Sequence, residues 1–292
     1  MMERLAAIVE VFFAFAFVHV TYRALKYFTP LGKWEGAVGV NFTPGVVMIV
    51  FTVGVLFLCG RDFEAYGLTL RHWRGNMNLG LFWAIAMIAL AGMGLAFTRI
   101  HFDASHPHND MTGRLAGAVF GLVVTILLVF LLRKQRGATI DGGSSGLVWL
   151  RVFALLALPL AVAAHYHRPV LKEFLAETWL VLGAGCGEEL FYRGYIQSRI
   201  NEAFGRPFHL MGMDFGIGLV VSSLLFGFLH ALNSVDYFRG QYNFAWWYGV
   251  QSCFMGLFYG CLREKTGSVV AGAVAHGLTD VWAGVPGLLS KS

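Results

Sequence analysis

The amino-acid sequence predicts an all-α, polytopic membrane protein, a bundle of about eight or nine transmembrane helices. Of its 292 residues, 57% are hydrophobic and only 13% are charged, and the mean hydropathy is +0.62. A soluble domain carries about 25% charged residues, because it needs polar side chains to cover its surface. The excess apolar side chains must therefore face lipid. The 36 glycines fit this class, since glycine is frequent in membrane helices and allows them to approach closely.

Nine segments of the chain have the composition of membrane helices, each of which needs about 20 mostly apolar residues. We expect these helices near residues 6–25, 42–60, 78–98, 115–132, 147–164, 174–195, 212–232, 245–263 and 268–285. The third and fourth segments contain no Lys, Arg, Asp or Glu. The first runs on into a full-length span, so we expect no cleavable signal peptide. Near the start of the eighth, Trp246, Trp247 and Tyr248 are typical of an aromatic belt at the membrane surface.

Residues 133–146, which read RKQRGATIDGGSSG, mark the predicted internal boundary. Gly/Ser-rich composition is typical of flexible linkers. We expect an N-terminal set of transmembrane helices, 1–146, whose role the sequence does not indicate. The C-terminal region, 147–292, carries the chemistry described below.

The net charge of +5 does not indicate nucleic-acid binding. The basic residues stand singly between apolar runs, as Lys and Arg do at the ends of membrane helices, and they form no stripe along one face. The partner that this pattern predicts is the lipid bilayer.

The first motif is GEELFYRG at 187–194. Ionisable residues within membrane spans are costly, so each one is a functional hypothesis. Adjacent helical residues point about 100° apart, so Glu188 and Glu189 face different neighbours. Glu189 and Arg193 are four positions apart and meet on one face, which leaves Glu188 available for another task. Taken alone, the motif also fits an interfacial salt bridge at the end of a span.

Two histidines follow on later apolar segments. His230 lies four residues after Phe226, and taken alone it is more typical of a packed, hydrogen-bonded histidine. His276 lies four residues before Asp280, in a stretch that is otherwise uncharged from 267 to 285. An acid beside a histidine fixes its tautomer and orients its ring, although a polar contact between helices is the alternative.

Together the three motifs predict one buried polar site. A bundle can bring them to a single pocket, and lipid disfavours them elsewhere. A glutamate beside a histidine in such a pocket can hold and deprotonate a water molecule. A second histidine can donate a hydrogen bond to the oxyanion that forms when water attacks a carbonyl group. This set is suited to peptide hydrolysis without a serine or cysteine nucleophile.

The order Glu-Glu-x-x-x-Arg, Phe-x-x-x-His and His-x-x-x-Asn/Asp resembles the signature of the CPBP family (CAAX protease and bacteriocin-processing, also called Abi). This family includes the CAAX prenyl endopeptidases. The resemblance covers roughly residues 147–285. It implies that Glu188 activates water together with His230, and that Glu189 and Arg193 brace the site.

The resemblance also implies that His276 and the residue four positions later stabilise the oxyanion. That residue is Asp280 here, where the family commonly has Asn. Because an ionised aspartate cannot donate a hydrogen bond, we expect Asp280 to orient His276 by accepting its other ring N–H. We expect Tyr192 and Phe226 to contact the substrate.

Two sets of side chains have the residue types of zinc ligands. One is Glu188, His230, His276 and Asp280; the other is a polar loop with His101, Asp103, His106, His108 and Asp110. The sequence has no HExxH motif, and the mechanism that the family resemblance implies uses no metal. We therefore expect no cofactor, with zinc as the alternative, and we expect the polar loop to be solvated.

The resemblance implies an intramembrane endopeptidase in a bacterial cytoplasmic membrane. Its expected substrate is a membrane-associated peptide or protein with a lipidated or C-terminal sorting-type segment. Two other classes remain open: a non-catalytic immunity or scaffold protein with the same fold, and a transporter that uses Glu188 as a proton relay. The intact polar set favours the enzyme.

Overall fold

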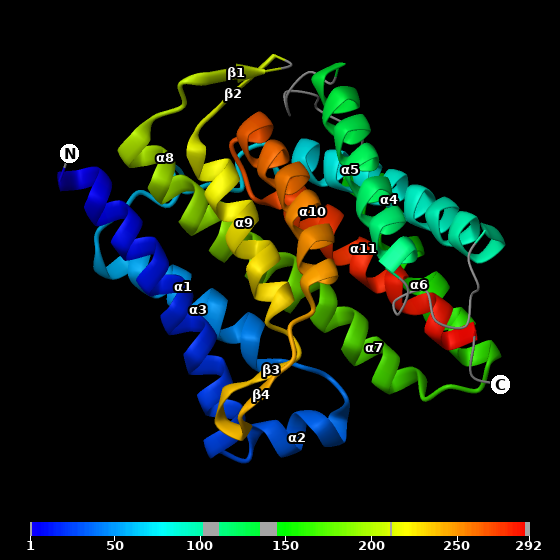
Figure 1. Cartoon of the computed structure of the whole chain (residues 1–292). Helices are drawn as coiled ribbons and strands as arrows, with labels where there is room; N and C mark the ends of the chain where they lie inside the picture. Colours follow the sequence, from blue (N-terminus) through cyan, green and yellow to red (C-terminus); the bar gives the residue numbers. More distant parts are fainter. Residues whose placement is uncertain (1, 102–110, 135–144, 211, 290–292) are drawn as a thin grey trace.

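The structure is a computed structural model that describes residues 2–101, 111–134, 145–210 and 212–289. It is all-α apart from short hairpins, and each predicted apolar segment falls on a helix or a helical run (Figure 1). The helices before the first motif are α1 (Met2–Phe28), α2 (Leu31–Val38), α3 (Thr43–Leu58), α4 (Trp73–His101), α5 (Met111–Lys134), α6 (Ser145–His165) and α7 (Val170–Trp179). The later ones are η1 (Leu180–Glu188), η2 (Leu190–Gln197), α8 (Ser198–Phe204), α9 (Ile217–Ala231), η3 (Tyr237–Arg239), α10 (Trp246–Thr266) and α11 (Val270–Leu289).

The outer surface of the bundle is apolar. Phe13, Phe57 and Phe153, on α1, α3 and α6, are 69%, 75% and 72% exposed. Within the described residues, two helical stretches are long and apolar enough to cross a membrane, Met2–Phe28 and Gly146–His165. The helical class is therefore confirmed, whereas the number of eight or nine spans stays a prediction.

The run from α7 to α8 is unusual because η1 and η2 are wound as π-helix over nine and eight residues. Such winding is rare and is frequent at functional sites. Glycines let this wide helix touch its neighbours on two sides. A Cβ atom at Gly45 of α3 would lie 2.6 Å from the Cα of Gly183, and one at Gly185 would lie 2.7 Å from the carbonyl oxygen of Ala273 in α11. The first motif is thereby held between α3 and α11.

Two antiparallel hairpins interrupt the second half. Strand β1 (Phe208–Leu210) pairs with β2 (Met213–Phe215), and β3 (Val235–Asp236) pairs with β4 (Gln241–Tyr242). The segment predicted at 212–232 therefore begins with a strand, and its helix starts only at Ile217.

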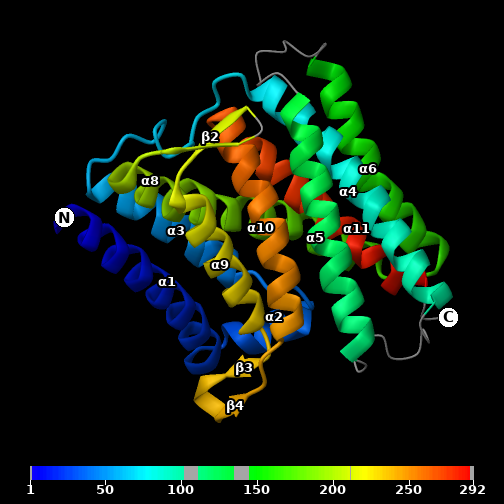
Figure 2. The same ribbon diagram turned by 45° about the horizontal axis from the view of Figure 1, so that its top comes forward.

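The helices of the first half pack among those of the second half. Helix α4 lies against α11, α5 against α10, and α1 and α3 against the helical run that carries the first motif (Figures 1 and 2). Most of the predicted boundary, 135–144, and most of the polar loop, 102–110, lie outside the described residues. The N-terminal helices are thus neighbours of the site and do not form a separate layer.

Candidate active site

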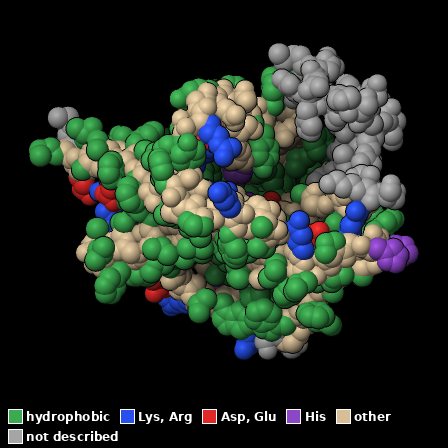
Figure 3. Space-filling view, turned by 90° about the horizontal axis from the view of Figure 1, so that it is seen from below, with side chains coloured by type: hydrophobic (Ala, Val, Ile, Leu, Met, Phe, Trp, Pro, Cys, Tyr) green, Lys and Arg blue, Asp and Glu red, His purple; other side chains and the backbone are tan. Residues whose placement is uncertain are grey.

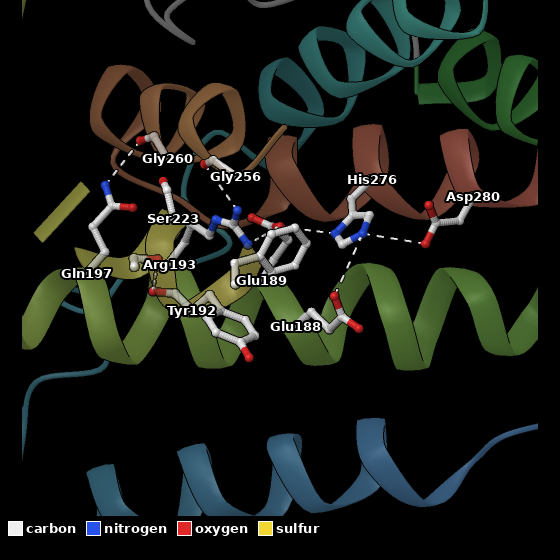
Figure 4. A network of polar contacts seen from close by, with 12 residues as sticks. Glu188, Glu189, Tyr192, Arg193, Gln197, Ser223, Gly256, Gly260, His276 and Asp280 are labelled. Atoms are coloured by element: carbon white, nitrogen blue, oxygen red, sulfur yellow. Dashed lines mark hydrogen bonds and ion pairs between the residues drawn. The ribbon is translucent and has the colours of Figure 1, made fainter. Parts of the chain in front are cut away.

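The two adjacent acids of the first motif occupy different environments. The side chain of Glu189 is 1% exposed and that of Glu188 is 16% exposed. Glu189 Oε1 lies 2.9 Å from Nη1 of Arg193, whose side chain is fully buried, so the predicted pair is present. Figure 4 shows Glu189 beside Arg193, and Glu188 below His276.

Arg193 is held by contacts beyond its ion pair. Its Nη2 donates to the carbonyl oxygen of Gly256 at 3.1 Å, and its guanidinium carbon lies 4.4 Å from the centre of the Phe226 ring. A buried charge with such partners fixes the relative positions of η2, α9 and α10. This geometry fits the predicted bracing role.

The ring of His276 stands among three carboxylates. Its Nδ1 lies 3.1 Å from Glu189 Oε1, and its Nε2 lies 3.4 Å from Asp280 Oδ2 and 3.9 Å from Glu188 Oε2. The ring also stacks on Tyr259, with 4.7 Å between the ring centres.

The structure differs from the sequence expectation in which carboxylate contacts which ring nitrogen of His276. We expected Asp280 to accept the ring N–H that faces away from the reacting group. The structure instead places Glu189 at Nδ1, and it places Asp280 at Nε2, the nitrogen that also faces Glu188. The physical reason is that Glu189 reaches the ring from a neighbouring helix, a contact that spacing along one helix cannot indicate.

His230 has a tautomer that its backbone contact determines. Its Nδ1 lies 2.8 Å from the carbonyl oxygen of Phe226, which can only accept a hydrogen bond. Nδ1 is therefore the donor, and in the neutral ring Nε2 is an acceptor. The ring of Tyr248 lies edge-on, with 5.1 Å between ring centres.

A cavity of about 830 Å³ opens onto one side of this cluster. Glu188, His230 and Asp280 line it, whereas Glu189, Arg193 and His276 lie behind them. The predicted set thus divides into a wall that faces the cavity and a buried layer that supports it.

The expected substrate contacts of Tyr192 and Phe226 are not supported by this geometry. The two residues are 0% and 2% exposed and do not line the cavity. Their rings pack edge-to-face with 5.2 Å between centres. They are packing residues here because the faces of η2 and α9 that carry them meet each other.

The cavity also has walls that the sequence did not reveal. Residues of α1 to α3 contribute, among them Tyr22 and Met48, and Tyr248 of α10 faces it too. The hydroxyl of Tyr22 lies 3.0 Å from Nδ1 of the buried His19, and His19 Nε2 lies 3.0 Å from the hydroxyl of Tyr237. Burial raises the pKa of Tyr237, which lies in the short helix η3 between β3 and β4, so this phenol stays neutral. The available signal was His19 itself, a histidine within the apolar run 11–20 of the first helix.

Among the residues that the structure describes, no group of three or more His, Cys, Asp or Glu side chains is arranged to hold a metal ion, and the metal-free mechanism stays a prediction. Nδ1 of His276 faces Glu189 and Nδ1 of His230 faces a carbonyl oxygen, and these contacts fix the orientation of each ring. The polar loop named above is not described.

A largely apolar helix bundle that surrounds an acid–histidine cluster beside a cavity has the form of a membrane-embedded hydrolase. Residues 148–282, a little under half of the chain, match the family model of the type II CAAX prenyl endopeptidases, Rce1-like. This segment is thus similar to the Rce1-like family, a membrane-embedded protease family, which agrees with the resemblance to CPBP proteins. No curated protein and no solved structure gives a significant match.

Proposed function

We propose that this protein is a multi-pass endopeptidase of a bacterial cytoplasmic membrane, which cleaves a membrane-associated peptide or protein with a lipidated or C-terminal sorting-type segment. The observation that carries this proposal is the shared cavity, where Glu188 and His230 face the same space while His276 stands behind Glu188. The similarity of residues 148–282 to a CAAX-type protease family supports peptide hydrolysis in general.

In the proposed reaction, a water molecule lies between Glu188 and Nε2 of His230. Glu188 takes a proton from the water as its oxygen attacks the scissile carbonyl carbon. Nε2–H of His276 donates to the oxyanion, and Glu189 holds the ring from Nδ1. When the tetrahedral intermediate collapses, the C–N bond breaks and Glu188 returns the proton to the leaving amine. No metal ion takes part.

The test is a cleavage assay with the purified chain in detergent. A prenylated CAAX peptide is incubated with the wild type and with Glu188→Gln, and the products are identified by mass spectrometry. We expect cleavage at one bond by the wild type and a loss of about 10²–10⁴ in rate for the variant, because Gln cannot accept the proton.

Glu177→Gln is the matched control. Glu177 belongs to the same helical run, is 6% exposed and does not line the cavity, so this variant should keep wild-type activity. Near-normal turnover by Glu188→Gln would refute its role as general base. An inactive wild type would favour the scaffold or transporter instead.

A further inference from the structure

The cavity is lined by acids and by cations that differ in exposure: the side chain of Glu188 is 16% exposed, whereas that of Arg239 is 68% exposed, and we call the end at Arg239 the mouth. Glu188 and Asp280 come from the segment that matches the protease family. Four basic residues line the same cavity from elements around its opening: Arg23, Lys26, Lys33 and Arg239. Three of these come from the first 38 residues, outside the matched segment. Figure 3 looks onto the end of the molecule that carries α2 and the β3–β4 hairpin, where Lys and Arg side chains stand among hydrophobic ones.

Two of the four cations have acidic partners. Lys26 Nζ lies 3.0 Å from Glu35 Oε2 and also donates to Asn41 at 2.6 Å. Arg239 Nε lies 3.6 Å from Asp236, which also lines the cavity and whose carboxylate accepts the backbone N–H groups that begin η3. The Lys26–Glu35 distance is that of a close ion pair, whereas the Arg239–Asp236 distance is longer. The Arg239 guanidinium can therefore still bind another anion.

The other two cations have no carboxylate partner among the described residues. Arg23 donates to the carbonyl oxygens of Leu232 and Val235, and its guanidinium carbon lies 5.3 Å from the centre of the Tyr237 ring. These contacts fix the guanidinium beside the hairpin and leave its charge uncompensated. Lys33 is exposed on α2 and forms no ion pair within the described part of the chain.

A cleft with an uncompensated positive mouth attracts an anion. The acids deeper in the cavity repel that anion, so it stays at the mouth while an uncharged peptide bond can reach Glu188. Lys and Arg bind a carboxylate through charge-assisted hydrogen bonds. A peptide that is cut near its end carries such a group, its own terminal carboxylate.

We propose that the mouth of the cavity, lined by Arg23, Lys33 and Arg239, binds the free α-carboxylate at the C-terminus of the substrate peptide. This subsite rests on the proposed function. Binding there would place the scissile bond at a fixed distance from the C-terminus of the substrate. The N-terminal helices would thereby select peptides that end near the scissile bond.

The test compares one prenylated CAAX peptide as a free acid and as a C-terminal amide, with the full chain in detergent. The wild type should prefer the acid by about tenfold in kcat/KM, the range for a charged hydrogen bond in a half-exposed site. Lys33→Gln should raise KM for the acid and leave the amide unchanged, and Lys33→Gln combined with Arg239→Gln should remove the preference.

Lys172→Gln is the matched control. Its Nζ lies next to the end of α2, 2.5 Å from where a Cβ atom of Gly39 would stand, yet Lys172 does not line the cavity. This variant should keep the tenfold preference. Equal cleavage of acid and amide by the wild type, or equal losses on both peptides in Lys33→Gln, would overturn the subsite.

Two further measurements separate the other outcomes. The affinity of Glu188→Gln for both peptides, measured by fluorescence anisotropy, tests the subsite without turnover. Tighter binding of the acid supports the subsite, and equal binding overturns it. This result is independent of the proposed function, because it holds even if the wild type cleaves neither peptide. Added phosphatidylglycerol tests a lipid headgroup as the anion. If Lys33→Gln lowers the retained lipid and leaves the acid-to-amide ratio unchanged, the mouth is a lipid site and the proposal is wrong.

Discussion

The wall of the cavity and the layer of buried charge behind it come from the same helices but differ in exposure. Asp280 and Glu188 in the wall have side chains that are 35% and 16% exposed, whereas Glu189 and Arg193 in the buried layer are 1% and 0% exposed. A charge at the wall can exchange protons and partners with the cavity. A charge in the buried layer has only its fixed partners, and the loss of one partner leaves the other uncompensated. Within one helical run, Glu188 is therefore placed to react, and its neighbour Glu189 is placed to hold the structure together with Arg193.

Arg193→Ala should produce the largest change, because it breaks the buried layer. Glu189 would keep its charge without its 2.9 Å partner, a loss of order 3–5 kcal/mol in folding stability. We expect a lower yield and a lower melting temperature in detergent as well as lost activity. Arg71→Ala is the control, since the Arg71 side chain is 73% exposed and its 3.4 Å pair with Glu64 should contribute about 0–1 kcal/mol. Equal melting temperatures for both variants would show that the buried layer does not stabilise the fold.

Gly272→Ala should disturb the contact between the layers without removing a charge. A Cβ atom there would lie 2.7 Å from Glu189 Oε2, so the carboxylate must shift and lose its position at His276. A shift of about 1 Å in such a group can lower the rate about 10²-fold. A Cβ atom at Gly284 on the same helix would have no described atom within 4 Å, so Gly284→Ala should leave the activity unchanged. Wild-type kcat in Gly272→Ala, measured by peptide cleavage, would contradict the positioning role of Glu189.

Asp280→Asn should have a moderate effect, because it changes the wall and leaves the buried layer intact. Asn keeps an oxygen that can accept a hydrogen bond from Nε2 of His276, now 3.4 Å from the aspartate. We expect activity within about tenfold of the wild type, the scale of one hydrogen bond. Activity should also survive a chelator. Stoichiometric zinc in the wild type, lost together with activity in the variant, would move the protein to the zinc hydrolases.

Tyr192→Phe should have the smallest effect. The hydroxyl of Tyr192 is buried and has no hydrogen-bond partner among the described residues, so its removal leaves none of them unsatisfied. We expect an unchanged KM and an equal or higher melting temperature. Tyr195→Phe is the comparison, because the Tyr195 hydroxyl donates to Glu10 at 2.7 Å and its loss should cost about 1 kcal/mol. A raised KM in Tyr192→Phe would restore the substrate contact that the sequence predicted.

The sequence by itself determined the helical class, the order of the three motifs and the Glu189–Arg193 pair. These features depend on composition and on spacing within one helix, where a distance of four residues fixes which side chains meet. Spacing also separated Glu188 from Glu189, since neighbours on a helix point in different directions.

Only the tertiary structure decided which nitrogen of His276 faces which acid, that Tyr192 and Phe226 pack inside, and that α1 and α2 form the mouth of the cavity. Each of these contacts joins residues far apart in the chain. They depend on how closely the helices approach, which glycines such as Gly45 and Gly185 permit. Periodicity along a helix gives the face on which a side chain lies, but the partner on that face is fixed by packing between helices.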